Sequence, residues 1–186
     1  MNKLSLTGTL LISASFGVGS FAQAAKADTT KTTSDITFTA GELQIAQAPS
    51  AITFGSHKLS SEEQTYTEVD EEGKATDSTL TVGDYRGQTA AGWSLTAKLE
   101  TADFGGMDLS IHPKGAAGTT DYATFTDQTL NGEGQTIATV TPEKMAKEKP
   151  DTQFALGAAL HIPANTSLMA KQYTTTIDWN LQSAPQ

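Results

Sequence analysis

The chain has 186 residues, no cysteine and a formal net charge of −9, with 21 acidic side chains against 12 lysines and arginines. Without cysteine there is neither a disulfide nor a lipid-modified N-terminal cysteine, so the fold must depend on its hydrophobic core. The acidic balance argues against a nucleic-acid partner, because phosphate binding needs clustered basic side chains. Anionic wall polymers and membranes are also repelled overall, so any affinity for them must come from a local site.

The first 24 residues are predicted to be a secretory signal peptide. Lys3 supplies the positive charge, an apolar run extends from Leu4 to Val18, and Ala22-Gln23-Ala24 fits an A-x-A cleavage site. The apolar run is too short to span a membrane as a helix. We therefore expect export without membrane insertion after cleavage, a disordered leader at residues 25–33, and one domain at residues 34–186.

Short segments with alternating apolar residues fill most of the chain after residue 34. A period of two predicts β-strands, and the Gly, Pro, Asn and Asp residues between them suit turns. The pattern predicts an all-β fold, an antiparallel β-sandwich of about nine or ten short strands. The segments lie at residues 35–45 (one unit, 35–40 and 43–45, interrupted at Gly41), 52–54, 64–69, 79–82, 93–99, 107–111, 123–126 (the weakest), 137–140, 154–162 and 173–181.

One short helix fits between the last predicted strands. Thr141 suits its N-terminal cap, Pro142 suits its first position, and Pro150 ends it. The chain shows no repeat of fixed period and no second domain.

Two Trp-x-Leu triplets contain both tryptophans of the chain, Trp93 with Leu95 and Trp179 with Leu181. On a strand, residues two apart point to the same face, and both faces are otherwise apolar. Burial of an indole contributes enough stability to favour core packing. An exposed aromatic platform that binds a sugar ring is the alternative, and the sequence does not decide between the two.

A turn before the first triplet holds Arg86, the only arginine, two residues after Asp84. The simpler interpretation is an ion pair within the loop. The other is a binding contact, in which the guanidinium forks onto a carboxylate of a glycan peptide stem or of a partner. We favour the structural role slightly.

Signals of catalysis or of metal binding are weak. The acidic stretch of Glu68, Asp70, Glu71, Glu72 and Asp77 lacks the spacing of a known calcium loop. The histidines, His57, His112 and His161, lack paired metal-ligand spacing. Neither a nucleophile elbow nor a phosphate loop occurs. We expect a protein that is not an enzyme and needs no cofactor or metal.

The motifs together resemble the WxL-domain cell-surface proteins of low-GC Gram-positive bacteria. The resembling segments are residues 36–43, Phe54-Gly55, residues 82–87 followed by Gly92-Trp93-Ser94-Leu95, and residues 173–185 with Ile177-Asp178-Trp179-Asn180-Leu181. The resemblance implies a domain that binds peptidoglycan non-covalently, with Trp93, Leu95, Trp179 and Leu181 as motif residues. It also implies membership of a multi-protein surface complex with a membrane-anchored partner that binds the WxL domain.

The expected function is therefore non-covalent attachment of a secreted protein to the cell wall. No covalent wall-sorting signal is visible at the C-terminal end, in keeping with this expectation. A structural subunit that docks mainly to a membrane-anchored protein is the alternative. A wall hydrolase, which would need two carboxylates at catalytic separation, is a distant third.

Overall fold

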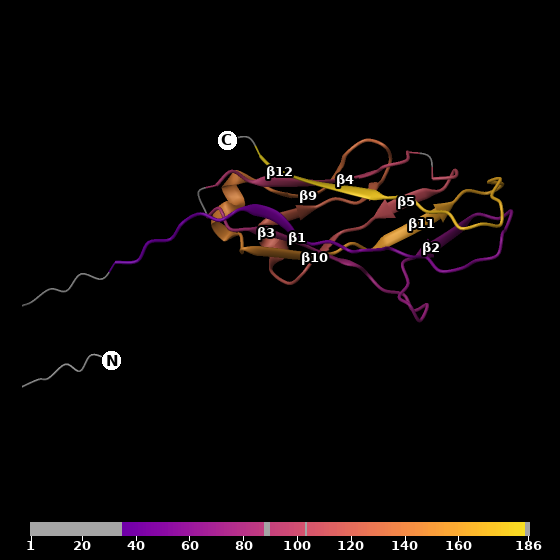
Figure 1. The fold of residues 1–186 in the computed structure, drawn as a ribbon, viewed down its shortest axis with the longest axis horizontal. Helices are drawn as coiled ribbons and strands as arrows, with labels where there is room; N and C mark the ends of the chain where they lie inside the picture. Colours follow the sequence, from indigo (N-terminus) through magenta and orange to yellow (C-terminus); the bar gives the residue numbers. More distant parts are fainter. Residues whose placement is uncertain (1–34, 88–89, 103, 185–186) are drawn as a thin grey trace, which may run out of the picture. The chain divides into compact units, whose positions relative to one another are not determined.

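The computed structural model describes residues 35–87, 90–102 and 104–184, apart from the side chain of Ala146. All strands of this part belong to the unit Phe38–Gln186 and pair antiparallel in three four-stranded sheets (Figure 1). The predicted all-β antiparallel sandwich is confirmed. The predicted signal peptide and leader lie outside the described residues.

The sheets have the strand orders β1-β3-β10-β6, β2-β11-β5-β8 and β12-β4-β9-β7. The strands are β1 (Leu43–Gln47), β2 (Gln64–Thr67), β3 (Thr79–Asp84), β4 (Trp93–Leu99), β5 (Asp108–Ile111), β6 (Lys114–Gly115), β7 (Ala123–Phe125), β8 (Gln128–Thr129), β9 (Gln135–Val140), β10 (Asp151–Ala155), β11 (Ala158–Ile162) and β12 (Ile177–Ser183).

Two predicted strands are wrong. Residues 35–40 form no strand, and Ile36 and Phe38 are 78 % and 84 % exposed. Residues 52–54 also lie outside the strands, although Ile52 and Phe54 pack against the core. Alternation shows which side chains share a face, but a strand also needs a neighbour for its backbone hydrogen bonds.

The long apolar series at residues 154–162 forms two strands in different sheets instead of one. β10 pairs with β3, and β11 pairs with β2 and β5. Gly157 lies between them with φ of 57°, a conformation that favours glycine. A Cβ atom there would lie 2.8 Å from the carbonyl oxygen of His112. The hydrogen-bonding partners change at this glycine, while Phe154, Leu156 and Ala158 all remain buried.

The predicted helix is present as a short 3-10 helix. It begins at Pro142 and ends at Lys147, with Thr141 extended at the capping position, and the Thr141 side chain makes no capping hydrogen bond. A second 3-10 turn, Thr119–Asp121, precedes β7.

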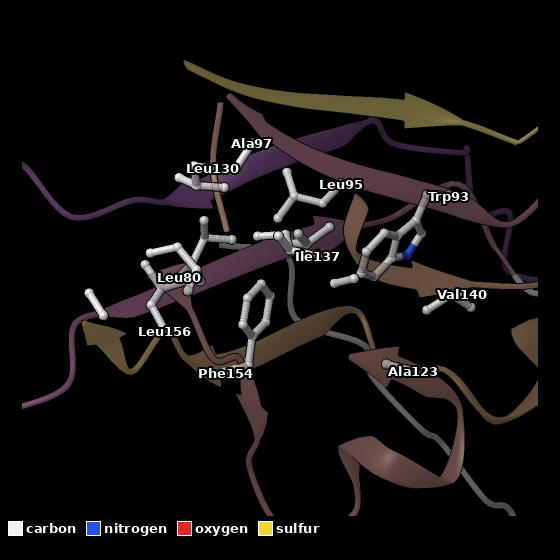
Figure 2. Packing of buried hydrophobic residues seen from close by; sticks show 14 of the residues in the cluster. Leu80, Trp93, Leu95, Ala97, Ala123, Leu130, Ile137, Val140, Phe154 and Leu156 are labelled. Atoms are coloured by element: carbon white, nitrogen blue, oxygen red, sulfur yellow. The ribbon is translucent and has the colours of Figure 1, made fainter. Parts of the chain in front are cut away.

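The core lies between the first and third sheets and continues beneath the second. Leu80 and Phe154 come from the first sheet, and Trp93, Leu95 and Ile137 come from the third (Figure 2). Leu109 and Ile111 of β5 extend the same cluster. Along β4 the alternate residues Trp93, Leu95, Ala97 and Leu99 are buried, as a period of two requires.

Candidate functional site

Trp93, the tryptophan of the first triplet, is a core residue. Its side chain is 1 % exposed, and its indole Nε1 donates a hydrogen bond to Oε1 of Glu148 at 2.5 Å. Burying an indole removes roughly 150–250 Å² from water, which contributes at most about 4–6 kcal/mol. Leu95 is fully buried beside it. The first triplet therefore stabilises the sandwich, and its side chains are not accessible to a ligand in this structure.

Asp84 and Arg86 form a nearly buried ion pair. Arg86 donates from Nε to Oδ1 of Asp84 at 2.9 Å and from Nη2 to Oδ2 at 2.6 Å, while the Asp84 side chain is only 1 % exposed. Nη2 also donates to the Ala91 carbonyl, and Nη1 donates to Oγ of Ser183 in β12. Asp84 thus occupies the guanidinium fork, which the alternative interpretation would leave for an external carboxylate, and the Arg86 side chain joins the turn to the last strand.

Glu148 completes this arrangement, and the sequence did not single it out. Burial raises the pKa of its carboxyl to about 7, while the hydrogen bond from Trp93 opposes the shift. The neighbouring Asp84 carboxylate raises the pKa further, and the Arg86 guanidinium lowers it. We call the set of Asp84, Arg86, Trp93, Glu148 and Ser183 the Arg86 cluster. It places two carboxylates around a single guanidinium.

Trp179 and Leu181 occupy a different environment from the first triplet. β12 is an edge strand that pairs with β4, with Trp179 opposite Ala97 and Leu181 opposite Leu95. The register turns both side chains toward the core, but at the edge of the sheet they are only half-buried. The two triplets are therefore not equivalent, because only the second reaches the surface.

Trp179 lines a cavity of about 1430 Å³, which we call the Trp179 cavity. Two strandless loops form much of its wall, at the end of the fold where β2, β5 and β11 lie (Figure 1). The volume exceeds that of a typical small-molecule site and suits an extended ligand. The described lining residues are 49–60, Gln64, Tyr66, Phe104, Met107, Leu109, Leu160, Ile162, 168–177 and Trp179.

The wall of this cavity contains both aromatic and polar groups. The rings of His57 and Tyr66 stack with their centroids 3.5 Å apart, and His57 donates from Nε2 to the Phe54 carbonyl at 2.5 Å. Thr175 has a buried hydroxyl oxygen without a hydrogen-bond partner among the described residues. Flat rings beside polar groups are the usual composition of a site that binds sugars or peptides.

Two carboxylates of the acidic stretch have structural roles. Glu68 is buried, and its carboxylate accepts hydrogen bonds from the backbone and hydroxyl of Ser78. Asp70 accepts from the backbone nitrogens of Glu72 and Lys74, which shapes an exposed turn. Within the described ranges, no three His, Asp or Glu side chains are placed to hold a metal ion.

A family model for the WxL domain, described as a surface cell wall-binding domain, matches residues 23–185. The chain belongs to the WxL family. Comparison with curated proteins gives no match. In the part of the chain that the structure describes, no helix is long and apolar enough to cross a membrane. Membership places this WxL domain among surface domains that bind the cell wall.

Proposed function

We propose that the protein is exported and attaches non-covalently to peptidoglycan through the Trp179 cavity. The family match carries the wall-binding part of the proposal. The choice of surface rests on Trp179, the one motif tryptophan of the described structure that lines a cavity. Because the chain is acidic overall, a local site of this kind is the form that wall affinity must take.

A sedimentation assay with purified peptidoglycan tests this proposal. The mature protein, residues 25–186, should co-sediment at moderate salt, and Trp179→Ala should bind at least about tenfold more weakly, because it removes the aromatic platform. Leu181→Ala is the matched control: Leu181 lies on the same strand and face and is also half-buried, but does not line the cavity. Equal losses in both variants would reject the cavity as the binding surface.

The proposal includes binding without catalysis. Prolonged incubation of the protein with peptidoglycan should release no reducing ends above background. Release that scales with protein concentration would instead favour a wall hydrolase.

Docking to a membrane-anchored protein is the second candidate function, and the free edge of β12 favours it. β12 pairs with β4 on one side, and the described residues provide no strand on the other. An exposed edge can accept a strand from a partner. Under this candidate, retention on cells should be lost when the neighbouring surface proteins are deleted, while retention in their absence would contradict it.

A further inference from the structure

We infer that the Trp179 cavity selects a carboxylate-bearing ligand, the peptide stem of peptidoglycan, over a neutral glycan. The inference rests on the proposed function and specifies its ligand. Its basis is the distribution of charge around the cavity.

The wall of the cavity carries positive charge in a strongly acidic chain. Lys58 and Lys171 line it on two different loops. None of the described lining residues is Asp or Glu, although the chain holds 21 acidic side chains. Neither lysine has a carboxylate partner among the described residues. Two unpaired ammonium groups therefore remain available to a ligand.

The described acidic residues adjacent in sequence to the lining residues are engaged elsewhere. Asp178, between Ile177 and Trp179, lies on the other face of β12, and its carboxylate lies 3.8 Å from Nζ of Lys98. Asp108 and Glu63 both contact the ring of His161 at 3.3 Å. These contacts hold the three carboxylates in other ion pairs, so among the described lining residues only the two lysines carry a formal charge.

The lysines stand beside groups that suit a peptide attached to a sugar. Nζ of Lys171 lies 4.8 Å from the centroid of the Tyr173 ring, so a cation and an aromatic surface occur together. Ile177, Leu109 and Trp179 provide apolar surface in the same cavity. The described lining contains no arginine and no dense basic cluster, which a phosphate polymer would favour. Two separate lysines match the single carboxylates of a peptide stem better than they match a phosphate polymer.

The test uses sacculi stripped of phosphate-containing wall polymers, in native form and with their carboxylates converted to amides. Native stripped sacculi should bind the wild-type mature protein, and amidated sacculi should bind about tenfold more weakly. Soluble stem peptide should compete for binding, whereas neutral N-acetylglucosamine oligomers should not.

Charge-reversal variants supply the matched control. Lys58→Glu/Lys171→Glu should lower binding to native stripped sacculi about tenfold or more. Lys74→Glu/Lys114→Glu changes the net charge equally at exposed positions outside the cavity and should bind as the wild type does. Far-ultraviolet circular dichroism checks that all variants are folded.

The outcomes separate the inference from the proposed function. If the wild type fails to bind native stripped and unstripped sacculi alike, the proposed function fails. If it binds native and amidated stripped sacculi equally, or binds only when the phosphate polymers are present, the selection of a carboxylate is wrong. Equal losses in the two charge-reversal variants would show a bulk electrostatic effect and overturn the assignment to the cavity.

Discussion

The two tryptophans share the Trp-x-Leu motif but have different structural surroundings. Trp93 is closed in by the core and by Glu148, whereas Trp179 stands at a sheet edge and lines a cavity. The sequence predicted that each triplet shares a face with apolar residues, but it could not show that one strand is central and the other an edge. Glu148 was missed for a similar reason, because its neighbours Asp84 and Trp93 are distant in sequence.

The stability of the two alanine variants should differ. Trp93→Ala should lower the free energy of unfolding by about 3–5 kcal/mol, because it empties a fully buried site and leaves Glu148 without its donor. Trp179→Ala should cost less, since its side chain is only partly buried. Urea denaturation of both variants measures this difference, and equal losses would contradict the placement of Trp179 at an edge.

The raised pKa of Glu148 predicts a pH-dependent stability. The folded state binds its proton more tightly than the unfolded chain, so this contribution is complete below the unfolded pKa of 4.5 and is lost as pH rises through about 7. Glu148→Gln should match the wild type at pH 5 and be more stable at pH 8, by about 1 kcal/mol after allowance for solvent screening.

Denaturant titrations at both pH values measure this difference. Glu133→Gln, at an exposed turn, is the control for the change from carboxyl to amide. A Glu148→Gln variant that is less stable than the wild type at pH 8 would contradict the conclusion that burial disfavours the ionised form of Glu148.

The long central strands were predictable, but the short and irregular segments were not. The sequence predicted β4 because its inward residues alternate over seven positions. The two-residue strands β6 and β8 are too short to show a period. Residues 35–40 show a clear period and yet have no pairing strand in the structure. In the loops that line the Trp179 cavity, the alternation at residues 52–54 and 173–176 predicted strands that are absent there, so the cavity could not be located from sequence.

The pairing of β4 with β9 depends on Gly92. A Cβ atom at this position would lie 1.9 Å from the Val140 carbonyl oxygen, so Gly92→Ala must displace a backbone atom. We expect a loss of about 3 kcal/mol or failure to fold. Gly134→Ala near the start of β9 is the control, because its Cβ would lie 3.5 Å from Oγ1 of Thr96. Denaturation midpoints measure the loss, and similar midpoints for both variants would contradict the close approach of Gly92 to the Val140 carbonyl.

The net negative charge of the molecule opposes its proposed binding to the cell wall. A chain with a net charge of −9 is repelled by an anionic wall, so attachment requires a site that differs from the rest of the surface. The Trp179 cavity provides such a difference, with lysines and aromatic rings and no described acidic lining residue. Net charge could be read from composition, whereas this local reversal appears only when loops distant in sequence come together.

Acrylamide quenching of the two indoles tests the central claim, that the wall ligand covers Trp179 and not Trp93. Trp93→Phe leaves Trp179 as the reporter, and Trp179→Phe leaves Trp93. In the free protein Trp179 should be quenched readily and Trp93 hardly at all, because their exposures differ. Soluble peptidoglycan fragments should protect Trp179 and leave Trp93 unchanged. If saturating fragments bind and the quenching of Trp179 stays the same, the cavity is not the wall-binding surface.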